Sequence, residues 1–556
     1  MMMPRLALLQ VGAKNSMKIK IDADAVIVGS GAGGSVVAAQ IAEAGYKVVV
    51  LEKGRHFPRT ELHLLEGRST DMYEHGSYLT TNDGSAMLFA GSNLGGGTTV
   101  NWSASFKTPA HVRKEWVTEF GLKMFEEGSE HYEEVMERVC ERMGVQQEAA
   151  QPHENLGNAM LRKGCEAMGM HVGNVPRNSA ADHYCGWCGM GCKSGNKKAA
   201  GRTWLLDAVK AGAVILTSCE ARKVILQQQR QHRRGVAGVI ARSRSSGSSS
   251  SSSSSSRGWN GQVELEMSAR VVVMAAGALW TPVLLRRSGL RNEHIGKNLH
   301  IHPVLSVWGY FPDAPSHVKP YEGGIMTSFS AHAANWETSG YGAVLMVPSL
   351  HPGGFAAFMP WHGAMDGKLS MLRFSKTAHL VALTRDTSSG SVSEDKDDED
   401  RLSIEYKMRD VDRSHCLDAA CNGLRVLAAS GASLIGTPNV DGAAQAQLDL
   451  SNSTQLEEFL AYVRSSSLRN SNSPLGSAHQ MGTCRMGVSP STSVVDPSGE
   501  TWEVKGLFVA DTSVFPSATG VNPMVTAQSI AFCTSQSILR FLLNKTHDPP
   551  RQSSRL

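Results

Sequence analysis

The chain has 556 residues, too many for one compact core, so we expect two or more structural parts. The formal net charge is only +4, and the basic residues are scattered and not interleaved with aromatic residues, which argues against nucleic-acid binding. No apolar run reaches the roughly 18 residues of a membrane-spanning helix.

The two ends of the sequence bear on location. Met1 to Ala13 contains only a short apolar run, Leu6–Leu9, and does not have the pattern of a secretory signal. The ten cysteines are therefore expected to be reduced and intracellular. The last residues, Ser554-Arg555-Leu556, are similar to the peroxisomal address Ser-Lys-Leu. A peroxisomal or membrane-associated location is therefore predicted, with a random basic tail as the alternative.

The first predicted elements form the start of a dinucleotide-binding fold. Ala25–Val28 has the pattern of a buried strand and leads directly into Gly29–Gly34. Ser35–Ala44 has helical spacing, and Lys47–Leu51 is a second buried strand that ends at Glu52. This is a GxGxxG fingerprint in its required context, with a strand before it, a helix after it and an acidic residue about 20 positions on.

Each residue of this fingerprint meets a separate physical need. Gly29 permits the tight turn, Gly31 lets the backbone approach a pyrophosphate, and Gly34 lets helix and strand pack closely. The free N–H groups and the dipole of the helix start favour the negative charge, and Glu52 is placed to accept from ribose hydroxyls. A glycine-rich turn without a ligand is the alternative, and the motif alone does not separate FAD from NAD.

The middle of the chain is more mixed. Residues 109–201 are predicted to be mostly helical, and residues 214–290 contain a β-hairpin pattern interrupted by Ser243–Ser256, which we expect to be a disordered loop. From 304 to about 455, short apolar runs alternate with turns. This part includes the acidic loop Glu394–Asp400, which is interpreted as a solvated hairpin tip.

The C-terminal segment favours a flavin. Gly506–Asp511 is predicted to be a short buried strand ending in an acidic residue. A helix then begins near Asn522-Pro523 and continues to Leu543, with a polar residue and a proline as start signals. A second helix N-terminus beside the cofactor suits the negative charge of a reduced flavin ring, which a nicotinamide does not carry. We therefore predict FAD.

Together these motifs resemble the glucose–methanol–choline (GMC) oxidoreductase family, and within it the long-chain alcohol oxidases of plants and related organisms. The resemblance covers Asp22 to about Leu543. It implies an α/β fold in which a discontinuous Rossmann-like FAD-binding domain carries an α+β substrate-binding cap domain. Its carriers include Gly29–Gly34, Gly91–Gly97 with Asn101, Gly277–Leu290, Gly296–His300, His479–Gly487, Asp511 and Asn522-Pro523, and, for the alcohol oxidases, Val49–Gly54, Asn101–Ser103 and His183–Lys193.

The resemblance also implies a division of the chain. We predict FAD-binding segments at 22–108, 202–303 (with the serine-rich loop at 243–257) and 471–545, a cap region at 109–201, a substrate-binding domain at 304–470 and a tail at 546–556. The FAD-binding residues it implies are Gly29, Gly31, Gly33, Gly34, Glu52, Gly91, Gly95, Asn101, Val224, Asp511, Pro523 and Met524.

Alcohol oxidation needs a base, because a hydride leaves the carbon readily only once the hydroxyl loses its proton, and histidine titrates in the useful range. The resemblance implies that His479 is this base and that Asn522 hydrogen-bonds the same oxygen. A satisfied core histidine and a simple helix cap are the respective alternatives. His300 and His302 are interpreted as structural.

The motif Cys185-x-x-Cys188-x-x-x-Cys192 is ambiguous. Three thiols at this spacing are compatible with zinc or an iron–sulfur cluster, and His183 is a candidate fourth ligand. The interpretation we favour is a glycine-rich turn with buried thiols and no metal.

The resemblance implies that a long-chain primary alcohol is oxidised to the aldehyde and that O₂ is reduced to hydrogen peroxide. The alternatives are a flavin alcohol dehydrogenase with another acceptor, a fatty acid photodecarboxylase, and a flavin-binding protein without enzymatic activity. Peripheral membrane contact, the oligomeric state and the chain-length preference stay open.

Overall fold

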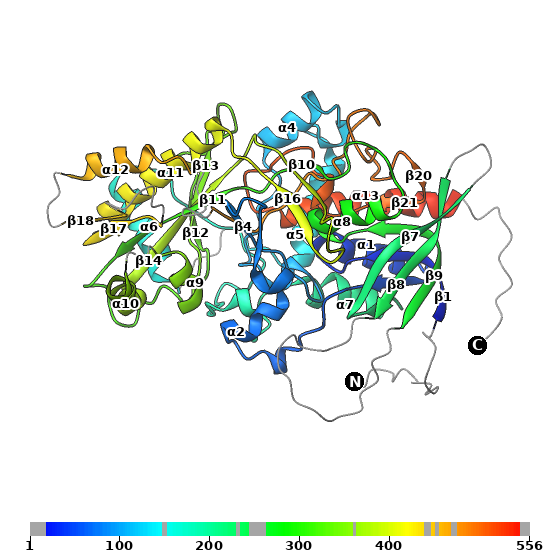
Figure 1. Cartoon of the computed structure of the whole chain (residues 1–556), viewed down its shortest axis with the longest axis horizontal. Helices are drawn as coiled ribbons and strands as arrows, with labels where there is room; N and C mark the ends of the chain where they lie inside the picture. Colours follow the sequence, from blue (N-terminus) through cyan, green and yellow to red (C-terminus); the bar gives the residue numbers. More distant parts are fainter. Residues whose placement is uncertain are drawn as a thin grey trace.

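The computed structural model describes residues 18–146, 153–228, 234–243, 263–359, 363–438, 446–450, 455–468 and 475–544. Except for Ser243, the serine-rich loop predicted at 243–257 lies outside the described residues, as does the tail predicted at 546–556. Two bodies of structure stand side by side in Figure 1, one around β1 and β9 and the other around β11 and β14.

The first body is built on an eight-stranded sheet that carries the fingerprint. Its order is β20-β8-β9-β1-β2-β6, with β21 on β9 and β7 on β8. Val26 pairs in parallel with both Val49 and Val272, which explains the continuous apolar runs, since parallel strands are buried on both faces. The strands are β1 (Lys18–Val28), β2 (Val48–Leu51), β6 (Val214–Leu216), β7 (Cys219–Gln228), β8 (Arg234–Ser243), β9 (Glu264–Met274), β20 (Val504–Lys505) and β21 (Leu507–Val509).

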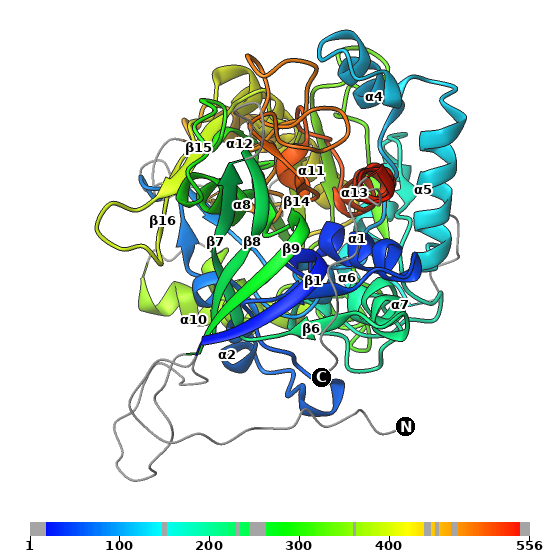
Figure 2. The same cartoon turned by 90° about the vertical axis from the view of Figure 1, so that its right-hand side faces the viewer.

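Helices gather on one side of the parallel strands of this sheet, as Figure 2 shows. The first is the fingerprint helix α1 (Ala32–Glu43), and the C-terminal helix α13 (Met524–Asn544) packs against it. With α5 (Glu130–Met143) and α7 (Trp204–Lys210), they bury the apolar side chains of α1. These parallel strands and helices confirm the predicted α/β fold class.

A ten-stranded sheet forms the second body. Its order is β3-β4-β19-β11-β14-β13-β12-β5, with β17 on β11 and β18 on β17. The helices α6 (Leu156–Ala167) and α11 (Asp410–Ala429) cover one of its faces. The strands are β3 (Leu79–Thr80), β4 (Ala86–Leu88), β5 (Gly173–Asn174), β11 (Val304–Tyr310), β12 (Ser328–Ser330), β13 (Ala343–Met346), β14 (Thr377–Thr384), β17 (Leu434–Gly436), β18 (Gln447–Asp449) and β19 (Leu475–Ser477).

Side chains of this sheet alternate between a core and a cavity. On β14, Leu380 and Ala382 belong to the core under α6 and α11, whereas Val381 and Leu383 line a cavity on the opposite face. Successive side chains of a strand point to opposite faces, so one strand serves both surfaces. The sheet therefore supplies a rigid wall for the site described below.

The sheets do not follow the predicted segment boundaries everywhere. The strands β3, β4 and β19 lie in segments that we assigned to FAD binding, yet they belong to the ten-stranded sheet.

The remaining α-helices are α2 (Glu66–Ser69), α3 (Gly97–Val100), α4 (Ala110–Thr118), α8 (Gly277–Arg287), α9 (Pro352–Ala357), α10 (Ala364–Arg373) and α12 (Leu456–Arg464). Across the described ranges, no helix combines the length and the apolar character that crossing a membrane requires.

The acidic loop is a hairpin tip with residues 396–399 exposed, as predicted, but it also makes ion pairs that the sequence did not predict. The hairpin consists of β15 (Gly390–Glu394) and β16 (Leu402–Glu405), and β10 (Lys297–Leu299) completes a small sheet. Asp400 lies 3.0 Å from the guanidinium groups of both Arg222 and Arg242 on the eight-stranded sheet. The acidic residues therefore attach the hairpin to the first body.

Candidate active site

A cavity of about 810 Å³ lies between the two sheets. One end is formed by the fingerprint and the other by the cavity face of the ten-stranded sheet. Of the predicted site residues, Gly34, Gly95 and Val224 do not line it. The residues that do are Gly29, Gly31, Gly33, Glu52, Gly91, Asn101, His479, Asp511, Asn522, Pro523 and Met524.

The start of α1 is held by backbone packing that leaves no room for side chains. A Cβ on Gly33 would lie 1.8 Å from the carbonyl oxygen of Ala510, and one on Gly34 would lie 2.1 Å from that of Gly29. Around a Cβ on Gly31, by contrast, there is no protein atom within 4 Å. Gly33 and Gly34 are thus required by packing, and Gly31 opens onto free space in the cavity.

Glu52 is tied to the fingerprint loop. Its carboxylate accepts hydrogen bonds from Ser30 N (3.1 Å), Ser30 Oγ (2.6 Å) and Gly54 N (2.8 Å), and burial raises its pKa. Ser30 Oγ also accepts from Gly95 N–H at 2.9 Å. Ser30 occupies a variable position of GxGxxG, so the motif gave no signal of this link. Gly95 supports the loop through its N–H and does not face the cavity.

Asp511 connects α8 to the segment that follows β21, at the same edge of the sheet as the fingerprint. Its carboxylate accepts from Gly277 N (2.8 Å), Thr281 Oγ1 (2.6 Å) and Ser513 N (2.8 Å). Burial raises its pKa. Asp511 therefore holds the start of α8 beside the end of β21, in addition to lining the cavity.

His479 and Asn522 meet where the two halves of the cavity join. His479 Nε2 lies 3.4 Å from Asn522 Nδ2, and Asn522 Oδ1 is buried with no hydrogen-bond partner among the described residues. Burial lowers the pKa of His479 to about 4, so its ring is neutral at neutral pH. A neutral ring can accept a proton.

A second histidine, His302, contacts the first, which the interpretation as a structural residue did not anticipate. The His302 and His479 Nδ1 atoms are 3.2 Å apart, and burial places the pKa of His302 well below its ordinary value. Gly520 N–H donates to His302 Nε2 at 2.9 Å, so the proton of the neutral His302 ring is on Nδ1.

This contact governs which nitrogen of His479 carries a proton. With His302 donating to its Nδ1, the neutral His479 ring keeps its proton on Nε2, next to Asn522. A lone pair on Nε2 requires both rings to move their proton to the other nitrogen, which breaks the hydrogen bond from Gly520. His302 is therefore a positioning residue for His479.

Three cavity residues escaped the sequence analysis because they come from distant segments. Lys53 Nζ donates to Glu74 Oε1 at 2.6 Å and lies 4.3 Å from the ring centroid of Trp280. Trp280 Nε1–H donates to the same carboxylate at 3.0 Å. Burial is the largest single effect on the pKa of Glu74 and raises it, but the effects of Lys53, His75 and the hydrogen bond from Trp280 together outweigh it. The pKa of Glu74 therefore lies below its ordinary value. This network forms a charged part of the cavity wall.

Val224, one of the residues expected to bind FAD, does not line the cavity. Its N–H donates to Ser288 Oγ at 2.8 Å, and from this part of the chain Cys219, Glu220 and Ala221 line the cavity instead. The cysteine motif lies next to the cavity, to which its turn contributes Gly186, Gly189 and Met190. The functional contact of Val224 stays a prediction.

The residues present fit FAD. Gly31 provides the open space that a pyrophosphate needs at the start of a helix, and Glu52 is placed for the ribose. At the other end, the unpaired Asn522 Oδ1 and the start of α13 offer polar groups to the ring system. The cavity is continuous between these ends.

Comparison with known proteins agrees with this geometry. A family model described as GMC oxidoreductase matches residues 69–304 and 386–531, and a model described as NAD(P)-binding Rossmann-like domain matches residues 27–60. Over 534 residues the chain is 44% identical to the long-chain-alcohol oxidase FAO4A of Arabidopsis thaliana, covering 95% of this chain and 70% of that protein. It is 42% identical to the long-chain-alcohol oxidase FAO3 of the same plant, covering 94% and 68%.

Solved structures show the same fold. The pyridoxine 4-oxidase from Mesorbium loti superposes with a TM-score of 0.64 at 18% identity, covering 93% of this chain and 99% of that one. A variant of the formate oxidase of Aspergillus oryzae RIB40 gives 0.65 at 15% identity, covering 94% and 99%. At these identities the likeness concerns the fold alone.

Two glycines of the fingerprint should respond differently to alanine. Gly31→Ala should leave the melting temperature of the FAD-free protein unchanged and weaken FAD binding, because its methyl group meets no protein atom. Gly33→Ala should lower the melting temperature as well, because its methyl group collides with Ala510. Thermal unfolding and flavin titration of both variants test this, and equal destabilisation by both would contradict it.

Proposed function

Because the chain belongs to the GMC oxidoreductase family, we propose that it is an FAD-dependent long-chain-alcohol oxidase that converts a fatty alcohol to the aldehyde and releases hydrogen peroxide. The observation that carries the proposal is the position of His479 and Asn522. They lie between the half of the cavity lined by glycines and the half lined by the ten-stranded sheet. A substrate hydroxyl at this junction has its carbon chain on the sheet side.

The substrate half of the cavity is apolar. Its walls include Met326, Met346, Phe358, Val381 and Leu383. Such a surface binds an alkyl chain by removing it from water, at roughly 0.8 kcal/mol per buried CH₂ group. Ser306 is among the few polar side chains that line it, so a sugar or another polyol would find few hydrogen-bond partners there. The chemistry of this half therefore favours a long alkyl chain.

The chain's own residues prepare the hydroxyl for oxidation. Asn522 holds the oxygen, and His479 takes the proton once its lone pair is on Nε2, with His302 carrying its own proton on the opposite side. The apolar walls exclude water, which protects the proton transfer. Bound FAD supplies the two-electron acceptor for the hydride, and O₂ takes these electrons to become hydrogen peroxide.

The experiment that tests the function is oxygen uptake with peroxide release by the purified FAD-loaded protein, using primary alcohols of increasing length. We expect kcat/KM to rise with chain length, with one peroxide formed per aldehyde. Dye reduction without oxygen uptake would contradict the oxidase and indicate a dehydrogenase. Hydrocarbon formation from a fatty acid in light would indicate a photodecarboxylase.

His479→Ala should retain yellow bound flavin and lose turnover. The expected loss in kcat/KM is about 100- to 10,000-fold, the usual contribution of general acid–base catalysis. Flavin absorbance and single-turnover flavin reduction measure the two effects separately. The variant Val411→Ala, at an exposed position outside the cavity, is the control. Undiminished flavin reduction in His479→Ala would remove His479 from the mechanism.

The low pKa of His479 predicts the pH dependence. Because the ring stays unprotonated until the pH approaches about 4, kcat/KM should stay level from pH 7 to about 5 and fall below that. The folded pKa lies below the ordinary 6.5, so the unfolded chain binds this proton more tightly, and the free energy of unfolding also falls as the pH drops from 6.5 toward 4. A kcat/KM profile that falls with an apparent pKa near 6.5 would contradict this.

We further propose that the protein contacts membranes through α10. Met365, Leu369 and Leu372 are 68%, 41% and 79% exposed and share one face of this helix by their spacing. The neighbouring helix α9 lines the cavity, and Glu66, the first residue of α2, accepts hydrogen bonds from the start of α9. Both views place α2 and α10 on the same side of the molecule (Figures 1 and 2). A substrate dissolved in lipid would enter from this side.

The double variant Met365→Ser/Leu372→Ser should bind zwitterionic phospholipid vesicles at least about tenfold more weakly, since each buried apolar side chain contributes about 1.5–3 kcal/mol. Its activity on a short, water-soluble alcohol should be unchanged. Val488→Ser, at a position 56% exposed elsewhere, is the control. Equal vesicle binding by both variants would contradict the proposal. The peroxisomal address at Ser554-Arg555-Leu556 lies outside the described residues and stays a prediction.

A further inference from the structure

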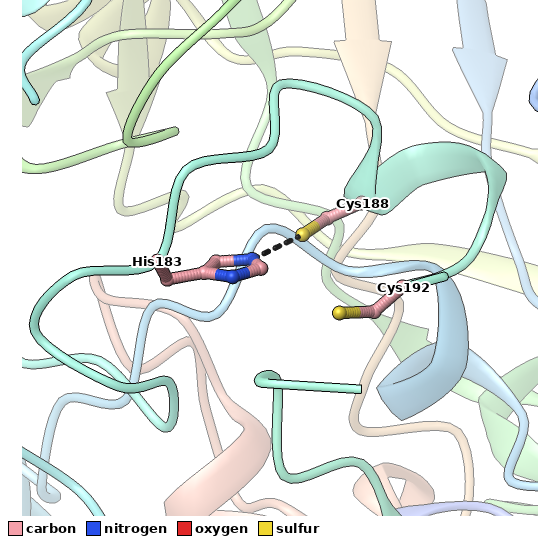
Figure 3. A group of neighbouring side chains, drawn as sticks. All are labelled: His183, Cys188 and Cys192. Atoms are coloured by element: carbon pink, nitrogen blue, oxygen red, sulfur yellow. Dashed lines mark hydrogen bonds between the residues drawn. The ribbon is translucent and has the colours of Figure 1, made fainter. Parts of the chain in front are cut away.

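The cysteine motif folds into a compact cluster with His183. The side chains come from one turn between residues 183 and 192, and all four are buried: His183 is 3% exposed, Cys185 7%, Cys188 1% and Cys192 9%. In Figure 3, His183 and Cys188 point toward each other, with Cys192 beside them. All three cysteines are free thiols.

The distances among His183, Cys188 and Cys192 are those of ligands that share one small ion, and Cys185 adjoins this group through Cys188. His183 Nε2 lies 3.3 Å from Cys188 Sγ, and Cys185 Sγ lies 3.6 Å from Cys188 Sγ. The ligand atoms of His183, Cys188 and Cys192 all lie within 4.8 Å of one another. In a tetrahedral zinc site with Zn–S near 2.3 Å and Zn–N near 2.0 Å, neighbouring ligand atoms are about 3.6–3.8 Å apart.

The charge around the cluster fits the same ion. Zn²⁺ with three thiolates and a neutral imidazole has one net negative charge, which would be costly to bury alone. Lys197 is fully buried next to the cluster, and its backbone N lies 3.4 Å from Cys192 Sγ. One buried cation thus stands beside one expected anionic site.

Two other outcomes for these thiols fit the geometry less well. A disulfide needs sulfur atoms about 2.05 Å apart, and Cys185 and Cys188 are at 3.6 Å. A [4Fe–4S] cluster places each of its cysteine sulfurs on a different iron atom with sulfide between them, and therefore needs them farther apart than two ligands of one ion.

We propose that His183, Cys185, Cys188 and Cys192 bind one structural Zn²⁺ ion. With four protein ligands the site is closed, so the ion has no open position for a substrate and serves the fold. This interpretation replaces the metal-free turn favoured on sequence grounds, because the structure supplies the fourth ligand that the spacing of the cysteines left open.

The ion would stiffen one wall of the cavity. Gly186 and Gly189 of the same turn line the cavity, and Gly189 O accepts a hydrogen bond from Tyr73. Lys197 Nζ donates to the carbonyl oxygens of Thr99 (2.8 Å) and Asn101 (2.7 Å). The zinc site is therefore connected to the loop that holds Asn101 against the cofactor space.

The test is metal analysis of the purified full-length protein, expressed with zinc in the medium. We expect about one zinc per chain and no iron or acid-labile sulfide. X-ray absorption at the zinc edge should give three sulfur ligands near 2.3 Å and one nitrogen near 2.0 Å. Replacement by Co²⁺ should produce the long-wavelength bands of tetrahedral cobalt, beyond the absorption of the flavin.

Variants locate the site. Cys188→Ala should lose the zinc, whereas Cys421→Ala, at a cysteine equally buried on α11, should retain it. His183→Cys should retain zinc with four sulfur ligands, so that a folded variant is available even when Cys188→Ala fails to fold. Three results for the wild-type protein would overturn the proposal. These are equimolar iron and sulfide, a Cys185–Cys188 disulfide in mass spectra, and a folded chain that takes up no added Zn²⁺.

Discussion

The whole site depends on close backbone contacts at the start of α1, where three segments of the chain meet with no side chain between them. Gly33 rests on Ala510, and Gly34 rests on Gly29. Gly29, with a φ of 105°, rests on Ala275. One methyl group at Gly33 would push α1 away from Ala510, which follows β21 near the other end of the sequence. The same close approach leaves Gly31 facing open space, so one packing constraint creates both the sheet edge and the anion pocket in front of it.

Around this edge, the protein assigns separate tasks to separate surfaces. The glycine-lined half of the cavity, with the acidic residues Glu52 and Asp511, is the part that we propose for the nucleotide, and alternate side chains of β14 line the part that we propose for the alkyl chain. Between them, burial keeps His479 neutral over the physiological pH range. The ring can therefore accept a proton at Nε2 once its own proton has moved to Nδ1, and its contact with His302 controls that move.

Much of this was predictable because local patterns carry it. The fingerprint, the strands beside it and the start of α13 follow from glycine spacing, apolar runs and capping residues, and the structure brings His479, Asn522 and Asp511 to one cavity as expected. Contacts between distant segments left no local pattern. Ser30 with Gly95, Lys53 with Trp280, and the acidic hairpin with Arg222 and Arg242 join positions about 65 to 230 residues apart, and the alternation of β14 was not resolved into a core and a cavity face.

The interleaved sheet has a consequence for how the protein is made. β1 pairs with β2 on one side and with β9 on the other, and β9 also pairs with β21. β1 therefore finds its second neighbour only after about 240 more residues, and the far edge of that neighbour waits for β21. Ala510, against which Gly33 rests, follows β21 directly. A nascent chain therefore has no completed place for FAD until the residues through Ala510 have been made.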